Sequence, residues 1–189
     1  MERNFETVLV EQCAPALAGL KAANLFRVEA RDAAALYAAV ETWRAAFAPR
    51  GLSVRVLKAC PRTACFLIYV YREKQLWPLL ADPAVSAYLA RAGYRPAADC
   101  AGYLDQLARR LRGDQPFPHE IGLFLGYPLA DVEGFVAHKG KNYTCCGCWK
   151  SYGDPGAARR LFERYRRCTE IYLRCFHSGT PLARLAVAA

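Results

Sequence analysis

Chemically active residues are densest between Phe117 and Phe135, a stretch punctuated by prolines and glycines. It contains His119, one of three histidines in the chain, and the adjacent Glu120. An imidazole with a pKa of about 6.5 exchanges a proton readily at neutral pH. His119 follows Pro118 in the first turn of an expected helix, where free backbone amides favour an anion. The stretch predicts a pocket for an anionic ligand, with His119 and Glu120 as acid–base candidates. In the structural alternative, His119 caps a loop and Glu120 pairs with an arginine.

Further candidates for this pocket lie at the ends of expected strands. Tyr71 and Arg72 end the most apolar strand, and the Arg72 guanidinium has the fork shape that binds a carboxylate or phosphate. Lys21 and Asn24 are three residues apart, so they face opposite sides of a strand unless a bulge or turn intervenes. We expect all four side chains to line one cavity with His119. For Arg72, a solvated helix start is the alternative.

A basic and aromatic segment around residues 139–152 provides the remaining ligand-binding candidates. Such residues interleaved in a loop suit a planar anionic ligand, for example a nucleotide, a flavin phosphate or single-stranded nucleic acid. A tryptophan anchored in the core between solvated lysines is the alternative. Together with the tyrosine of the Gly-Tyr-Pro corner, the candidates are Tyr127, Lys139, Asn142, Trp149 and Lys150.

Nine cysteines, an odd and scattered number, predict reduced thiols in a reducing cytoplasm. Cys145 and Cys148 have metal-ligand spacing, and Cys168 and Cys175 share one face of an expected helix. Four thiolates suit zinc or an iron–sulfur cluster. Seven residues of helix span about 10 Å, which is long for two ligands of one ion, so a metal centre ranks below free thiols. Cys13 is a candidate nucleophile, with a small buried side chain as the favoured interpretation.

Composition points to one domain over residues 1–189 in the cytoplasm. Hydrophobic residues make up 54% of the 189, enough for a substantial core. The longest apolar run, Ala64 to Tyr71, is far below the roughly 18–20 residues of a membrane span. The charged first residues lack the apolar region of a secretory signal. We expect no membrane partner.

The net charge of +9 is concentrated in the C-terminal third. Ten basic residues and three acidic ones lie between Lys139 and Arg184, which favours an acidic protein or, less strongly, nucleic acid as partner. A solvated helix face is the alternative. Residues 121–132 also resemble a helix-turn-helix, but Asp131 and Glu133 stand where a recognition helix needs hydrogen-bond donors, so a pocket ranks higher.

The hydrophobic periodicity predicts an α+β domain. We expect helices at 5–11, 31–49, 72–80, 83–92, 99–112, 119–125, 129–138 and 154–177, the first ended by Pro15. Strands 52–60 and 63–71 should form an antiparallel hairpin because their connection is short. With an N-terminal strand at 20–28 they form a small mixed or largely antiparallel sheet covered by several helices. Residues 142–152 are expected to be irregular or extended, and 182–187 to form an edge strand.

Residues 13–26, 67–72, 117–128 with Asp131, and 147–154 resemble, in order, domain of unknown function family 3793 of anaerobic bacteria. The resemblance covers nearly the whole chain and implies a redox context with flavodoxins, but no activity. At Ser151 the family usually has an aliphatic residue, so we expect that position to be unimportant. Whether the protein is an enzyme stays open. The candidates are a pocket protein for a small anionic ligand, with His119 as acid or base or in a redox accessory role, and a basic module that docks a flavodoxin-like acidic protein or nucleic acid.

Overall fold

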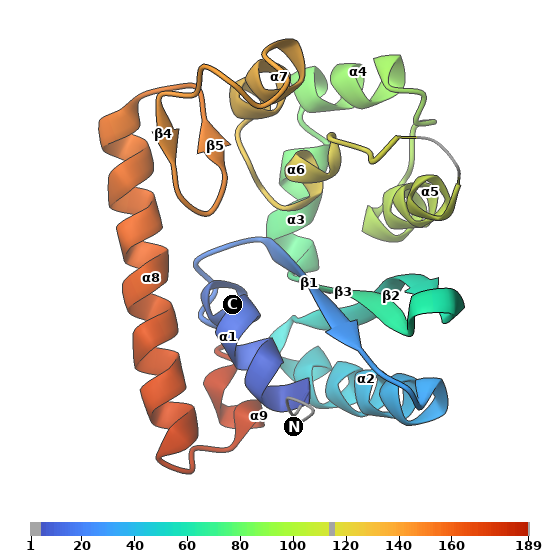
Figure 1. The fold of residues 1–189 in the computed structure, drawn as a ribbon, viewed down its shortest axis with the longest axis vertical. Coiled ribbons are helices and arrows are strands. Elements are labelled where there is room, and N and C mark those ends of the chain that lie inside the picture. The colour runs from blue at the N-terminus through green and yellow to red at the C-terminus, as the bar shows by residue number, and fades with distance from the viewer. Residues whose placement is uncertain (1–4, 114–115, 189) are drawn as a thin grey trace.

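The computed structural model describes residues 5–113 and 116–188, and a three-stranded antiparallel sheet forms the middle of that part (Figure 1). Its strands are β1 (Ala23–Glu29), β2 (Ser53–Cys60) and β3 (Cys65–Tyr71), in the order β1-β3-β2. The predicted hairpin is confirmed, and the turn Pro61–Thr63 connects its strands. The register of β2 against β3 shifts between Val56 and Lys58.

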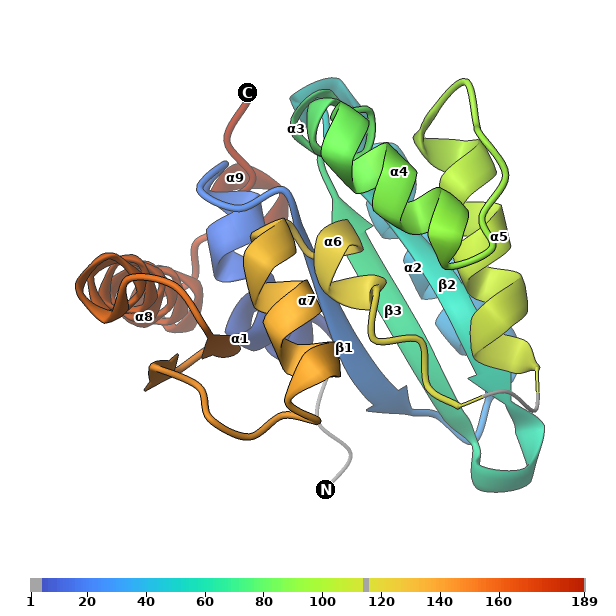
Figure 2. The ribbon, with the colours of Figure 1, turned by 90° about the horizontal axis from the view of Figure 1, so that it is seen from above.

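Helices cover both faces of the sheet, as the nearly continuous apolar run of β3 predicts (Figure 2). On one face lie α1 (Phe5–Leu17), α2 (Ala33–Phe47), the 3₁₀ turn Ala48–Arg50 and α9 (Leu182–Leu185). Phe66, Ile68 and Val70 point to this side because alternate residues of a strand share a face. Asp32 starts α2 by accepting a hydrogen bond from the Ala35 amide at 3.0 Å.

The other face packs against α3 (Glu73–Leu80), α4 (Pro83–Arg91), α5 (Cys100–Arg112) and α6 (Ile121–Phe124). Asp82 and Asp99 accept hydrogen bonds from the first free amides of α4 and α5. Beyond α6 follow α7 (Leu129–Ala137), a small antiparallel pair β4 (Cys145–Cys146) and β5 (Lys150–Ser151), and the long helix α8 (Pro155–His177). Helix α8 runs along α1 at the edge of the molecule (Figure 1).

Two predicted elements are wrong. Helix α1 continues through Pro15 to Leu17, because a proline in the last turn removes a single amide and its carbonyl still accepts from the Leu20 and Lys21 amides. Residues 182–187 form the short helix α9 instead of a strand, with Leu182 and Leu185 buried at helical spacing. Among the described residues, no helix is both long and apolar enough to cross a membrane.

Candidate functional site

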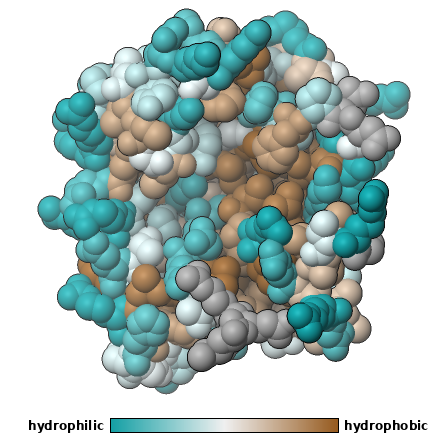
Figure 3. All heavy atoms as spheres, viewed as in Figure 1, coloured by the Kyte–Doolittle hydropathy of each residue, from teal (hydrophilic) through white to brown (hydrophobic). Residues whose placement is uncertain are grey.

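A pocket of about 480 Å³ lies between α1, the start of β1 and α8, and we call it the Lys21 pocket. Hydrophilic residues follow the outer edge of this side of the molecule over α8, and hydrophobic residues gather right of centre (Figure 3). The pocket is lined by Glu11, Gln12, Pro15, Lys21, Asn24, Leu25, Leu125, Tyr127, Cys148, Tyr165, Arg166, Thr169 and Glu170.

Lys21 is the buried cation of this pocket, with 8% of its surface exposed. Its Nζ lies 5.2 Å from the centroid of the Tyr127 ring, a cation–π contact. Within the described part of the chain, no oxygen accepts a hydrogen bond from this ammonium and no carboxylate pairs with it. Burial lowers the pKa of Lys21, and the nearby thiols of Cys148 and Cys13 oppose that shift.

Asn24 provides a second unsatisfied group in the same wall. Its Oδ1 is fully buried and accepts no hydrogen bond from the residues that the structure describes. Lys21 and Asn24 reach one pocket because β1 begins only at Ala23, so Lys21 lies in the preceding turn and the alternation of a strand does not apply to it. The turn allowed for in the sequence analysis is therefore present.

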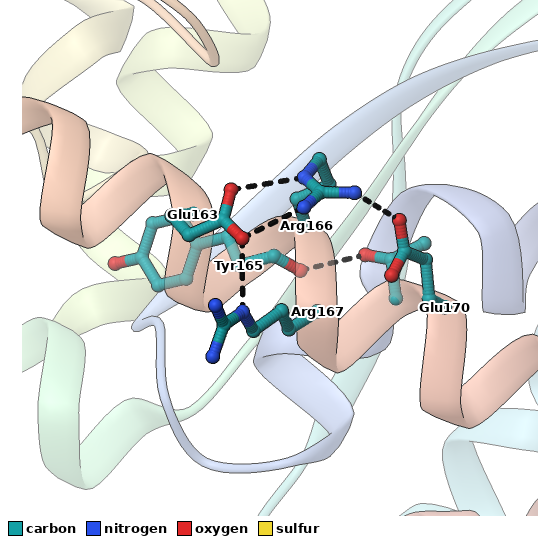
Figure 4. Close-up of polar contacts among 6 residues, drawn as sticks. Glu163, Tyr165, Arg166, Arg167 and Glu170 are labelled. Atoms are coloured by element: carbon teal, nitrogen blue, oxygen red, sulfur yellow. Dashed lines mark hydrogen bonds and ion pairs between the residues drawn. The ribbon is translucent and has the colours of Figure 1, made fainter.

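The α8 wall of the pocket carries a cation whose charge is already balanced (Figure 4). Arg166 donates to Glu163 at 2.7 and 3.0 Å and also to Glu170, and Arg167 donates to Glu163 at 2.9 Å. These hydrogen bonds lower the pKa of Glu163 to about 2. Arg166 is thus shared by two carboxylates, whereas Lys21 has none.

His119 lines a second, adjoining cavity of about 360 Å³, which we call the aromatic pocket. The imidazole is exposed, and its centroid lies 5.0 Å from that of Phe135. Tyr127 and Cys148 line both cavities. The single cavity expected from the sequence is therefore divided, with Lys21 and Asn24 on one side and His119 on the other. The aromatic pocket is lined by Phe117, His119, Ile121, Gly122, Tyr127, Asp131, Val132, Phe135, Cys146, Gly147, Cys148, Trp149 and Lys150.

Asp131 fixes the wall between the two pockets from the first turn of α7. Its Oδ2 accepts from Trp149 Nε1 at 2.7 Å, and its Oδ1 accepts from Tyr152 N at 2.7 Å and Ser151 Oγ at 3.1 Å. Trp149 is thereby held against the Tyr127 ring, with centroids 4.5 Å apart and planes at 21°. Ser151 is buried and bonded to this carboxylate, contrary to the expectation that its position is unimportant. The sequence signal for Asp131 was a carboxylate at the apolar start of a helix.

Three other predicted ligand-binding residues have contacts of their own or lie apart. Lys150 donates to the Gly140 carbonyl at 2.7 Å and lies over the ring of Tyr143. Lys139 and Asn142 are exposed in the loop before β4, with left-handed φ values of 50° and 57°, and line neither pocket. Their geometry gives the predicted ligand-binding role no support.

Arg72 is a buried structural cation instead of a ligand clamp or a solvated helix start. It is 1% exposed, and its guanidinium donates to four backbone carbonyls. The acceptors are the carbonyl oxygens of Ala16 (2.7 Å), Leu17 (2.8 Å), Arg50 (3.0 Å) and Val187 (2.8 Å). With four of its five N–H donors bonded to these carbonyls, Arg72 joins separate segments of the chain. It lines neither pocket.

Tyr71 and Glu120 also belong to the core. Tyr71 stacks on Tyr69 with centroids 5.3 Å apart on the α5 side of the sheet. Glu120 is 7% exposed and accepts from Arg110 Nε at 2.9 Å and the Tyr94 hydroxyl at 3.1 Å. This is the arginine pairing named as the structural alternative, and Glu120 lines neither pocket.

The cysteines are free thiols that do not gather into a metal site. Residues 5–113 and 116–188 contain no group of three or more His, Cys, Asp or Glu side chains placed to hold an ion. Cys145 and Cys168 are buried, Cys148 is exposed, and Cys175 is half-buried on α8. Cys13 is fully buried, and burial raises the pKa of its thiol well above the ordinary range.

The residues that sequence reasoning missed in the Lys21 pocket come mainly from α8. Tyr165 donates to the Leu20 carbonyl at 3.4 Å, and Thr169 lies one turn further along the helix. Helical periodicity identifies both residues as inward-facing. It does not identify their neighbours, because α8 and α1 are too far apart in the sequence for a local pattern to predict their contact.

Comparison with known proteins identifies a family. A family model described as "Protein of unknown function (DUF3793)" matches residues 9–186, nearly the whole chain. No curated protein and no solved structure matches it.

Proposed function

The chain belongs to the DUF3793 family of proteins of unknown function, and from the chemistry of the Lys21 pocket we propose that it binds a small anionic molecule. The observation that supports this is the Lys21 side chain, which is 8% exposed and whose ammonium has no oxygen acceptor among the described residues. A cation in such a confined site is less well hydrated than in bulk water, so an anion that pairs with it is favoured. A carboxylate or phosphate of a ligand supplies the acceptor that the fold leaves out.

Asn24 narrows the class of ligand. Its buried Oδ1 needs a hydrogen-bond donor, and the described protein groups provide none. A ligand that satisfies both residues carries an O–H or N–H group beside its anionic group. Amino acids, hydroxy acids and sugar phosphates have this arrangement, so they form the class that we propose. We assign no catalytic step, because His119 faces the aromatic pocket on the other side of Tyr127 and Cys148.

Calorimetric titration with a panel of these acids tests the proposal, with Lys21→Met and Asn24→Leu as the informative variants. Lys74→Met is the matched control, since Lys74 is an exposed lysine on α3 outside the pocket. We expect Lys21→Met to lower affinity at least about tenfold, the effect of losing one charge-assisted hydrogen bond. Lys74→Met should leave affinity unchanged. Equal affinity in wild type and Lys21→Met for every acid that binds would remove the proposal.

A second candidate function is the docking of an acidic protein, such as a flavodoxin in a redox accessory role, on α8. Arg159, Arg160 and Arg164 are exposed, and none has a carboxylate partner among the described residues. Nucleic acid ranks lower, because the exposed face of α7 carries the Glu133 carboxylate where a recognition helix needs hydrogen-bond donors. A pull-down with a purified flavodoxin should weaken with salt and on changing the three arginines to glutamine. Capture that is insensitive to both would exclude this candidate.

A further inference from the structure

Two free thiols face each other at the turn end of the β2–β3 hairpin, on a different part of the fold from the Lys21 pocket. Cys60 and Cys65 are partners in the antiparallel register, and both are half-buried. Directly opposite residues of antiparallel strands project to the same face, with Cα atoms about 4.5–5.5 Å apart. A disulfide needs a Cα separation of about 4.4–6.8 Å. The backbone therefore already holds this pair at bridging distance.

An arginine from the neighbouring strand is directed at one of the two sulfurs. Arg27 donates to Cys65 Sγ through Nη2 at 2.8 Å and through Nε at 3.1 Å. Glu29 accepts from the same Nη2 at 2.7 Å and so orients the guanidinium. The Cys65 sulfur also contacts the Thr63 carbonyl at 3.2 Å and Glu29 Oε1 at 4.0 Å. Arg27, Thr63 and Glu29 together fix the position of this sulfur opposite Cys60.

The partner thiol has an environment that favours ionisation. Hydrogen bonds from the Thr63 side chain and amide, and more weakly the charge of Lys58, lower the pKa of Cys60. A lower pKa raises the fraction of thiolate, the nucleophilic form, at neutral pH. Cys13 and Cys100, by contrast, are buried thiols whose pKa values are raised. Cys60 is therefore distinct from these buried thiols in both access and ionisation.

We propose that Cys60 and Cys65 form a thiol–disulfide exchange site for low-molecular-weight anionic disulfides. The Cys60 thiolate attacks one sulfur of the substrate, breaks its S–S bond, forms a mixed disulfide and releases the first thiolate. The Cys65 thiolate, held by Arg27, then attacks the Cys60 sulfur, forms the Cys60–Cys65 bond and releases the second. Two protein thiols are oxidised, one small disulfide is reduced to two thiols, and a dithiol reverses the reaction. The anionic preference follows from Lys58 and Arg62 beside Cys60.

The test uses the full chain with Cys146, Cys148 and Cys175 changed to serine, which removes the other accessible thiols. The probe is dithiobis(nitrobenzoate), an anionic disulfide whose released thiolate is coloured. We expect one probe molecule to release two coloured thiolates and peptide mapping to locate a Cys60–Cys65 disulfide. Mapping that finds these two cysteines unlinked after the reaction would overturn the proposal.

Single variants separate the two steps. Cys60→Ser removes the attacking sulfur, so the first release should be slowed at least about tenfold. Cys65→Ser should release one thiolate and keep the adduct on Cys60. Arg27→Gln should leave the first release unchanged and slow the second about tenfold, the effect of losing a charge-assisted hydrogen bond to the attacking sulfur. General loss of structure would not slow the second release while sparing the first. Two releases from Cys65→Ser, or an unchanged first step in Cys60→Ser, would contradict the mechanism.

Two controls complete the experiment. Arg44→Gln removes an exposed arginine of α2 that pairs with Glu41, so it should change neither step. The double variant Lys58→Gln with Arg62→Gln should react more slowly than wild type, and the reduction in rate should be larger for the anionic probe than for neutral dithiodipyridine. An equal reduction for both disulfides would overturn the anionic preference. The exchange does not depend on the Lys21 pocket, so it fails or succeeds separately from anion binding there.

Discussion

Arg72 and Lys21 are both basic, both buried and both candidates for binding an anion on sequence grounds, yet the fold treats them in opposite ways. Arg72 is surrounded by four carbonyl oxygens from three separate segments of chain. Lys21 has the face of Tyr127 and an open pocket. A buried cation with four of its five donors used holds chain segments together. A buried cation with its donors unused, beside an unpaired amide, marks a place for a ligand.

The largest effect expected from this comparison is at Arg72. Arg72→Met leaves four buried carbonyls without their donor, so we expect the free energy of unfolding to fall by about 3–5 kcal/mol. Urea unfolding measures this, and Arg62→Met, at an exposed arginine, is the matched control. A loss of unfolding free energy below about 1 kcal/mol would show that water replaces the guanidinium. Arg72 would then not have the structural role that distinguishes it from Lys21.

Asp131 is the anionic counterpart of Arg72, since its carboxylate is also saturated by donors. Asp131→Asn removes the charge and one acceptor oxygen, and we expect a loss of about 2 kcal/mol because hydrogen bonds to charged groups are the stronger ones. Trp149 should also lose its fixed position, with a change in its fluorescence. Unchanged fluorescence would mean that the stack on Tyr127 holds the indole without Asp131.

Substitution of Lys21 should increase the free energy of unfolding, whereas substitution of Arg72 or Asp131 should decrease it. Lys21→Met removes a partly desolvated charge that has no carboxylate partner among the described residues, so we expect the ligand-free protein to gain about 1–2 kcal/mol. The folded-state pKa of Lys21 is lowered below its unfolded value of 10.5, so the unfolded chain binds the extra proton between the two values. Wild-type stability should therefore rise relative to Lys21→Met as pH increases through that window. A destabilised variant would show that Lys21 has a structural role like that of Arg72.

The smallest effect is expected at Glu163, an exposed carboxylate that pairs with Arg166 and Arg167. Its pKa is lowered from 4.5 to about 2, so its contribution is present above about pH 4.5 and lost as pH falls through 2. Glu163→Gln should barely move the thermal midpoint at neutral pH, because solvent screens the pair. The small difference in thermal midpoint between wild type and Glu163→Gln should vanish in acid. A difference that grew in acid would show that another titrating group causes it.

Periodicity and turn residues predicted most of the fold because those signals are local. The hairpin 52–60/63–71 and the boundaries of α8 both follow from neighbouring residues. The predictions that were wrong concern segments whose secondary structure is decided by tertiary contacts. Pro15 stays inside α1 because the following chain satisfies its carbonyl, and α9 is helical because Leu182 and Leu185 both enter the core.

The site was predictable in its residue types but not in its grouping. Lys21 and Asn24 were identified because polar residues beside a strand need a partner, and both line one pocket. Arg72 looked equivalent, since no pattern of side chains indicates that four backbone carbonyls converge on it. His119 and Lys21 were expected together, and the packing of Trp149 on Tyr127 separates them. Cys60 and Cys65 were passed over because a spacing of five residues is no metal motif.

The four carbonyl oxygens around Arg72 link the folding of the chain to the order in which its residues are synthesised. One of these oxygens belongs to Val187, and Leu182, Leu185 and Ala186 complete the core over α1. A ribosome delivers these residues long after α1 and the sheet have emerged. Until they arrive, the nascent chain exposes the apolar surface that they cover, so we expect it to depend on chaperones during synthesis and to reach its native state only once residue 187 is free.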